Sequence, residues 1–161
     1  MEAIKIGEEL DMDHVTRAAE LFLEGFSCSQ AVAMAFCDVT GLDEKLTARL
    51  ASSFGGGMGR MREVCGAVSC MLRVLGTIYG YDEAGDAAGK RALYARVQEM
   101  AAEFRAENGS IICRELLQGP PSDPNPTPRT AEFYKKRPCR LMVESAARIM
   151  EEFIEGHPIE E

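Results

Sequence analysis

The residues with the clearest capacity for chemistry are six cysteines in a chain of 161 residues. Four of them, Cys28, Cys65, Cys113 and Cys139, fall within the first turn of a predicted helix. A helix N-terminus presents unpaired amides and the positive end of the helix dipole, and both lower the pKa of a thiol. The pattern therefore predicts four thiols that are prepared to become anionic, either as metal ligands or as nucleophiles.

One segment combines a glycine run with one of these four cysteines. It covers residues Phe54 to Gly76 and has the sequence FGGGMGRMREVCGAVSCMLRVLG. Its glycine run leads directly into an apolar helix that carries Cys65 in its opening turn. Glycine adopts positive φ without steric cost, so the run can fold tightly and point successive N–H groups at one anion. The glycines expected to form such a cofactor-binding loop are Gly55, Gly56, Gly57 and Gly59. The alternative is that the run only connects two packed helices.

The other cysteines and both histidines are weaker candidates. Cys37 and Cys70 are expected in helix interiors, where a free cysteine usually acts as a small buried hydrophobic residue. His14 and His157 are isolated, and we expect them at the surface or in the tail rather than as ligands. The chain has no C-x-x-C pair, so cysteine spacing supports zinc less than it would in a zinc knuckle.

Helices are the elements that must position these residues. Apolar residues recur every three or four positions and strand-like alternation is almost absent, which predicts an all-α fold. We expect a single domain over residues 1–161, a bundle of about six to seven helices, with residues 118–137 as a proline-rich surface loop. Expected helix caps are Asp11 or Asp13, Ser27 and Asp43. The expected helices cover residues 11–25, 28–39, 43–51, 62–79, 83–107, 111–117 and 138–155.

Charge and composition limit the classes of partner. The formal net charge of -8 disfavours binding to nucleic acid and to anionic membranes. No apolar run approaches the ~20 residues of a membrane span, and no signal-peptide pattern is present, so we expect a cytoplasmic protein. In such a reducing compartment six cysteines argue against a disulfide framework. The expected partners are small molecules or proteins, foremost a redox partner protein, and a homo-oligomer is compatible with the sequence.

Four motifs together resemble the C-GCAxxG-C-C family of redox-active proteins. They are GFSCSQAV at 25–32, FGGGMGRMREVCGAVSC at 54–70, CRELL at 113–117 and RPC at 137–139. The resemblance covers nearly the whole chain and implies a small α-helical domain whose four characteristic cysteines correspond to Cys28, Cys65, Cys113 and Cys139. The chain departs from the family's CGAxxG signature, because Cys70 stands where the family has glycine. That departure would alter a close helix contact or add a fifth thiol to the site.

The leading functional hypothesis is that the four thiolates bind an iron–sulfur cluster, of the [2Fe–2S] type, for electron transfer or redox sensing. Helix N-termini and the glycine-loop amides would stabilise such an anionic cluster. The first alternative is a metal-free thiol–disulfide protein, an oxidoreductase if it is an enzyme, in which Cys65 attacks and Cys28, Cys113 or Cys139 resolves. A structural zinc site with the same four ligands is the second alternative, and separate reduced cysteines in an ordinary helical protein are the third.

Overall fold

The computed structural model describes residues 13–117 and 123–160, and within them every regular element is helical. The only strand-like pairing there is an isolated antiparallel bridge between Val64 and Ile112. The prediction of an all-α fold is confirmed. The elements are α2 His14–Leu23, α3 Cys28–Ala35, α4 Cys37–Thr40, α5 Glu44–Ala51, η1 Ser52–Phe54, α6 Gly55–Met58, α7 Gly66–Tyr79, α8 Ala87–Asn108, α9 Cys113–Leu117, α10 Ala131–Lys136 and α11 Cys139–Gly156.

Side-chain caps fix where the first helices begin. The Asp13 carboxylate accepts a hydrogen bond from the Val15 amide at the start of α2, and the Asp43 carboxylate does the same for Leu46 at the start of α5. Ser27 forms a reciprocal capping box with Gln30 at the start of α3. Each cap satisfies amides that have no partner within the helix. The predicted starts of these helices are therefore confirmed, with Asp13 rather than Asp11 as the first cap.

Three predicted helix boundaries are wrong. The helix expected from residue 83 begins at Ala87, where the Asp86 carboxylate accepts a hydrogen bond from the Gly89 amide. The helix expected to run from Cys28 to Val39 ends at Ala35, and the short α4 follows after Phe36. The helix expected from about Arg62 begins only at Gly66, because Arg60 and Arg62 have left-handed backbone conformations, with φ of 66° and 61°. Cys65 is therefore the N-cap of α7 and not a residue of its first turn.

The segment predicted as a proline-rich surface loop is only partly irregular. Residues 118–122 lie outside the described residues, but α10 forms within the remainder, capped by the Thr130 hydroxyl. Phe133 of α10 is buried, and Arg129 donates hydrogen bonds to the carbonyl oxygens of Phe22 and Phe26. The segment from Arg129 onward therefore packs against the bundle, which corrects the expectation of a surface loop up to residue 137.

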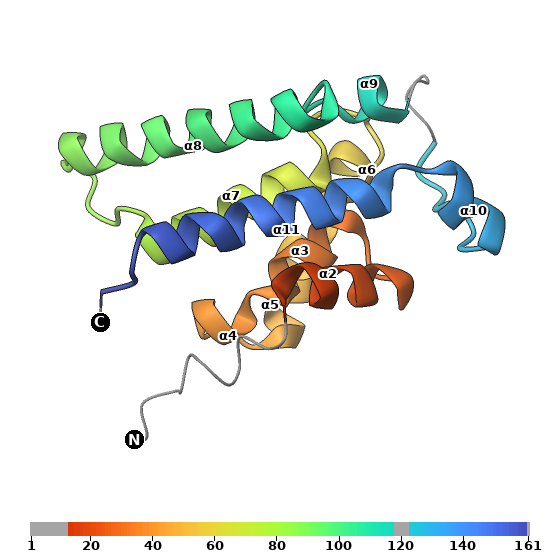
Figure 1. Cartoon of the computed structure of the whole chain (residues 1–161), viewed down its shortest axis with the longest axis horizontal. Helices are drawn as coiled ribbons and strands as arrows, with labels where there is room; N and C mark the ends of the chain where they lie inside the picture. The colour runs from red at the N-terminus through yellow and green to blue at the C-terminus, as the bar shows by residue number, and fades with distance from the viewer. Residues whose placement is uncertain (1–12, 118–122, 161) are drawn as a thin grey trace.

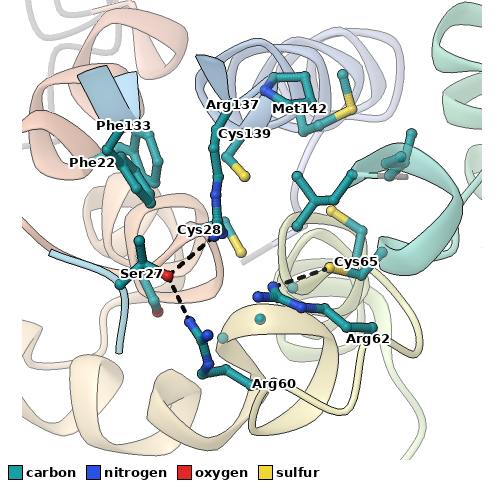
Figure 2. Close-up of a pocket in the computed structure, with 18 of the residues that line it drawn as sticks. Phe22, Ser27, Cys28, Arg60, Arg62, Cys65, Phe133, Arg137, Cys139 and Met142 are labelled. Atoms are coloured by element: carbon teal, nitrogen blue, oxygen red, sulfur yellow. Dashed lines mark hydrogen bonds between the residues drawn. The ribbon is translucent and has the colours of Figure 1, made fainter. Parts of the chain in front are cut away.

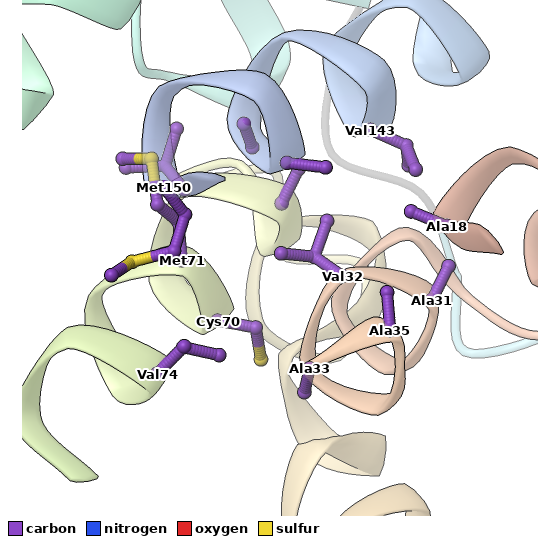
Figure 3. Packing of buried hydrophobic residues seen from close by; sticks show 14 of the residues in the cluster. Ala18, Ala31, Val32, Ala33, Ala35, Cys70, Met71, Val74, Val143 and Met150 are labelled. Carbon is purple, nitrogen blue, oxygen red and sulfur yellow. The ribbon is translucent and has the colours of Figure 1, made fainter. Parts of the chain in front are cut away.

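The bundle is built around α7 and α11, which lie side by side (Figure 1). The long helix α8 packs on one side of this pair, and α2 and α3 pack on the other. Small residues such as Ala31, Ala35 and Ala147 are fully or almost fully buried, so the helix backbones can approach closely (Figure 3). The starts of α7, α9 and α11 gather at the same end of the molecule as α6 and α10.

Helix α8 is the longest, with 22 residues, but only Met100 and Phe104 are buried along it. Charged residues recur through the rest of the helix, and Tyr94 is largely exposed. Neither α8 nor any other helix in residues 13–117 and 123–160 has the combination of length and apolar character needed to cross a membrane.

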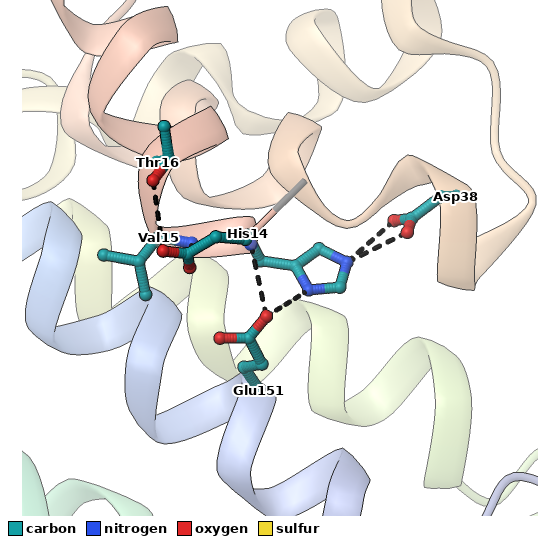
Figure 4. Close-up of polar contacts among 6 residues, drawn as sticks. His14, Val15, Thr16, Asp38 and Glu151 are labelled. Carbon is teal, nitrogen blue, oxygen red and sulfur yellow. Dashed lines mark hydrogen bonds and ion pairs between the residues drawn. The ribbon is translucent and has the colours of Figure 1, made fainter. Parts of the chain in front are cut away.

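His14 is buried, which corrects the expectation that it lies at the surface. Its ring stacks on Phe36 with the centroids 4.4 Å apart, and its two nitrogens lie 2.9 Å from carboxylate oxygens of Asp38 and Glu151 (Figure 4). Burial alone would lower the pKa of His14, but the hydrogen bonds and charges of these two carboxylates outweigh it and raise the pKa. His14 therefore links α2, α4 and α11 through contacts that favour the protonated form of its ring.

The raised pKa predicts a pH-dependent contribution of His14 to stability. A group whose pKa is higher in the folded state stabilises fully below its unfolded pKa of about 6.5, and the stabilisation is lost as pH rises through the folded value. We expect the difference in free energy of unfolding between wild type and His14→Gln to be larger at pH 6 than at pH 9. Urea unfolding at both pH values measures it, with the exposed His157→Gln as control. An equal difference at both pH values would contradict the linkage.

Candidate functional site

The site is centred on Cys28 and Cys65, whose side chains are hydrogen-bonded to each other. Cys28 is the first residue of α3, and Cys65 caps the start of α7, so the pair joins the N-terminal ends of two packed helices. Gly66 permits this approach. A Cβ atom on Gly66 would lie 2.6 Å from the Phe54 carbonyl oxygen and 2.8 Å from the Cys28 Sγ.

The environment of the pair favours a thiolate on Cys28. The S–H of Cys65 donates to the Cys28 sulfur, which outweighs the effect of burial, and the amides of Gly56, Ser29 and Ala67 also donate to it. These contacts lower the pKa of Cys28 to about 6. The same hydrogen bond, together with burial and the negative charge of Cys28, raises the pKa of Cys65 well above its usual value. The two sulfurs thus share one proton, held by Cys65, near neutral pH.

Cys113 is the first residue of α9 and lies against the bend that precedes α7. Its amide donates to the Glu63 carbonyl oxygen at 2.6 Å, and a guanidinium nitrogen of Arg62 donates to its Sγ at 3.7 Å. Burial raises the pKa of the Cys113 thiol, although the hydrogen bond and charge of Arg62 oppose this. A Cβ atom on Gly57 would lie 2.7 Å from the Cys113 Cβ, so glycine is needed where the bend meets α9.

Cys139, the first residue of α11, completes the set of four predicted site cysteines. Burial is the main reason that its pKa is raised to about 12. All four cysteines line one cavity of about 240 Å³, and the labelled sulfurs of Cys28 and Cys139 point into the same space (Figure 2). However, among the described residues no three His, Cys, Asp or Glu side chains lie close enough together to hold a metal ion.

Four arginines also line the cavity, and the predictions from sequence did not include this cluster as part of the site. They are Arg60, Arg62, Arg129 and Arg137. No aspartate or glutamate among the described residues lines it. Apolar side chains, including Phe22, Phe133 and Met142, form much of the remaining wall. The cavity therefore combines sulfur, positive charge and a partly apolar surface.

The glycines proposed as a cofactor-binding loop have different positions. Gly55 and Gly56 line the cavity, whereas Gly57 and Gly59 do not. Gly56, Gly57 and Gly59 have positive φ, as expected, but Gly55 does not. Of the four amides, only that of Gly56 donates a hydrogen bond to Cys28, so a single glycine N–H is directed at this sulfur. The others shape the bend.

Cys37 and Cys70 do not line the cavity. Cys70 is fully buried in the core, as expected, and the position where the family has glycine therefore does not add a fifth thiol to this site. Cys37 lies at the start of α4 rather than in a helix interior, is only partly buried, and its S–H donates to the Thr47 hydroxyl at 3.4 Å.

The fold and the site define an all-helical protein whose cavity holds a hydrogen-bonded pair of thiols. Residues 26–153 match the family model described as "Putative redox-active protein (C_GCAxxG_C_C)". The chain belongs to this family. No curated protein and no solved structure matches the chain.

The close approach at Gly66 can be tested by adding one methyl group. Gly66→Ala should destabilise the protein by about 1–3 kcal/mol, because backbone and sulfur atoms occupy the space that the new Cβ needs. Gly76→Ala in the same helix is the matched control, since nothing lies within 4 Å of its Cβ position. Alanine there should stabilise α7 by about 0.5–1 kcal/mol. Guanidinium unfolding measures both variants, and equal changes would refute the steric role of Gly66.

Proposed function

We propose that the protein is a metal-free thiol–disulfide oxidoreductase in which Cys28 is the nucleophile and Cys65 the resolving thiol. The observation that carries the proposal is the hydrogen-bonded pair, in which amides and the Cys65 S–H stabilise a thiolate on Cys28. The thiolate is the reactive form of cysteine in disulfide exchange. Because exchange needs only two neighbouring sulfurs, the arrangement of Cys28 and Cys65 is sufficient for it.

The chemistry would proceed in two balanced steps. The Cys28 thiolate attacks one sulfur of a disulfide R–S–S–R, forming a Cys28–S–S–R bond and releasing R–S⁻. Cys65 then gives its proton to the released R–S⁻, which leaves as R–SH, and the Cys65 thiolate attacks the Cys28 sulfur, which forms the Cys28–Cys65 disulfide and releases the second R–S⁻. Two electrons pass from the protein to the substrate. A redox partner protein in a reducing compartment such as the cytoplasm would return the pair to the dithiol.

From the sequence we expected Cys65 to be the attacking residue. The pKa shifts support the opposite assignment, with Cys28 attacking and Cys65 resolving. Cys65 accepts hydrogen bonds from the Ala67 and Val68 amides, but its proton is engaged with Cys28 and its own pKa is raised. Cys113 and Cys139 have raised pKa values and stay protonated near neutral pH. They would be walls of the cavity rather than nucleophiles.

Serine substitutions distinguish these roles. In Cys65→Ser the hydroxyl still donates to Cys28, so the variant should attack a small disulfide and accumulate a mixed disulfide at Cys28. Cys28→Ser should lose most of this reactivity, by about tenfold or more, and Cys37→Ser should behave as wild type. Mass spectrometry of acid-quenched reactions identifies the modified residue. If Cys28→Ser forms a mixed disulfide at Cys65 as fast as Cys65→Ser forms one at Cys28, the roles of nucleophile and resolving thiol are reversed.

An iron–sulfur cluster is the second candidate function. It is supported by the four cysteines and four arginines on one cavity wall, since an anionic cluster would be stabilised by positive charge. The separation of the thiols does not fit it, because the cysteines would first have to move together. Structural zinc requires the same rearrangement. The residues that would act as ligands are Cys28, Cys65, Cys113 and Cys139.

Metal analysis separates the two candidates. We expect protein purified under anaerobic conditions to contain no stoichiometric iron, sulfide or zinc, and to show a dithiol that oxidises by two electrons. Stoichiometric iron with sulfide, lost equally in Cys28→Ser, Cys65→Ser, Cys113→Ser and Cys139→Ser, would favour the cluster instead. Zinc alone, lost in the same variants, would favour the structural site.

A further inference from the structure

We propose that the substrate of the Cys28–Cys65 pair is a small anion containing a sulfur–sulfur bond, bound by the arginine cluster of the cavity. The arginine cluster is defined as Arg60, Arg62, Arg129 and Arg137. This inference rests on the proposed function, since it names the substrate class of the same site. It follows from the charge, fixed geometry and size of the cavity.

The charge of the cavity is opposite to that of the protein. The chain as a whole carries a formal net charge of -8, yet among the described residues the cavity wall has four arginines and no aspartate or glutamate. The pKa of Arg60 is lowered by burial and by repulsion from Arg62 and Arg137, so these cations lie close enough to destabilise one another. Collecting like charges in a partly buried space costs free energy unless an anion binds there.

The guanidinium groups are held in place by neutral acceptors. The Thr127 hydroxyl accepts hydrogen bonds from Arg60 at 2.9 Å and from Arg137 at 3.0 Å. Arg129 donates to two backbone carbonyl oxygens and lies over the rings of Phe22 and Phe133. Within residues 13–117 and 123–160, none of Arg60, Arg129 and Arg137 forms an ion pair with a carboxylate. The Arg60 Nε also donates to the Asp123 carbonyl oxygen at 2.9 Å, and the charge of Asp123 attracts Arg60 from beyond ion-pair distance, so the three charges are oriented and only partly offset.

The Cys28 thiolate supplies one negative charge against Arg60, Arg129 and Arg137, so a positive excess remains at the site of attack. A cavity of about 240 Å³ is sized for a small molecule rather than a folded protein surface. The sulfur pair lines the same space as the arginines. A molecule with a reducible S–S bond and short anionic arms would place the bond at Cys28 and the arms on the guanidinium groups.

Two kinds of small anion contain a reducible S–S bond: organic disulfides that carry carboxylates, and inorganic polythionates. Both react by the same balanced steps: R–S–S–R and the Cys28/Cys65 dithiol give the Cys28–Cys65 disulfide and two molecules of R–S⁻, with one proton released from each protein thiol that was protonated. For tetrathionate, R–S⁻ is thiosulfate. No further oxidant or reductant enters a single turnover.

Three aliphatic disulfides that differ in charge test the proposal: 3,3′-dithiodipropionate with two carboxylates, uncharged 2-hydroxyethyl disulfide, and cystamine with two ammonium groups. Rates of Cys28–Cys65 disulfide formation are measured at neutral pH and divided by the rates of the same disulfides with dithiothreitol. We expect the dicarboxylate to exceed the uncharged disulfide by about tenfold or more, and cystamine to be slowest. The preference should shrink with added NaCl, because salt screens charge. Equal normalised rates would overturn the proposal, and a tetrathionate arm shows which source reacts faster.

Substitutions in the arginine cluster test whether these residues cause the preference for the dicarboxylate. Arg60→Gln and Arg137→Gln should each reduce the ratio of the dicarboxylate rate to the 2-hydroxyethyl disulfide rate by about threefold. Lys45→Gln is the matched control, because it removes one positive charge from an exposed position of α5 that does not line the cavity. A similar loss in Lys45→Gln would mean that only the overall charge of the protein matters, which would refute a site at the arginine cluster.

A binding measurement separates this inference from the proposed function. The thioether 3,3′-thiodipropionate has no S–S bond, and calorimetry should detect its binding to Cys28→Ser and weaker binding to Cys28→Ser combined with Arg137→Gln. Binding without any disulfide exchange in the wild type would refute the oxidoreductase but keep the anion site. Exchange without binding or charge preference would keep the oxidoreductase and refute the anionic substrate.

Discussion

The hydrogen bond between the sulfurs of Cys65 and Cys28 is the interaction on which the site depends. It exists only because α3 and α7 bring their N-terminal ends together, and Gly66 leaves the space for that contact. The contact places both sulfurs among unpaired amides, so removing one proton from the pair costs less than removing it from either cysteine alone. The closeness of the two thiols is therefore a consequence of how two helices pack.

Much of the fold could be predicted from local signals. Asp13, Ser27 and Asp43 mark helix starts because their side chains accept hydrogen bonds from amides only a few residues away. The start of α7 could not be read in this way. It depends on the left-handed conformations of Arg60 and Arg62 and on the bridge between Val64 and Ile112, residues that are distant in sequence. Helix propensity alone predicted that α7 begins near Arg62, but pairing of the preceding residues with a distant segment delays its start to Gly66.

The parts of the site that sequence could not supply are also long-range. The cysteines could be placed at helix starts, but which two would be neighbours depends on the packing of α3 against α7. Arg60 comes from the bend before α7, whereas Arg129 and Arg137 flank α10, and the Thr127 hydroxyl binds both Arg60 and Arg137. His14 shows the same limit, since the carboxylates that keep it charged come from α4 and α11. No spacing rule in the sequence connects these residues.

A position at a helix start is not enough to make a thiol reactive. Cys113 and Cys139 also begin helices, yet burial dominates at both and raises the pKa of each thiol. Cys28 differs because three amides and a neighbouring S–H converge on its sulfur, so burial is outweighed rather than absent. Of four cysteines on one cavity wall, the one with the most hydrogen-bond donors becomes the anion. In the proposed function, the surrounding arginines act on the negative charge of Cys28, and their excess of positive charge favours the approach of anions.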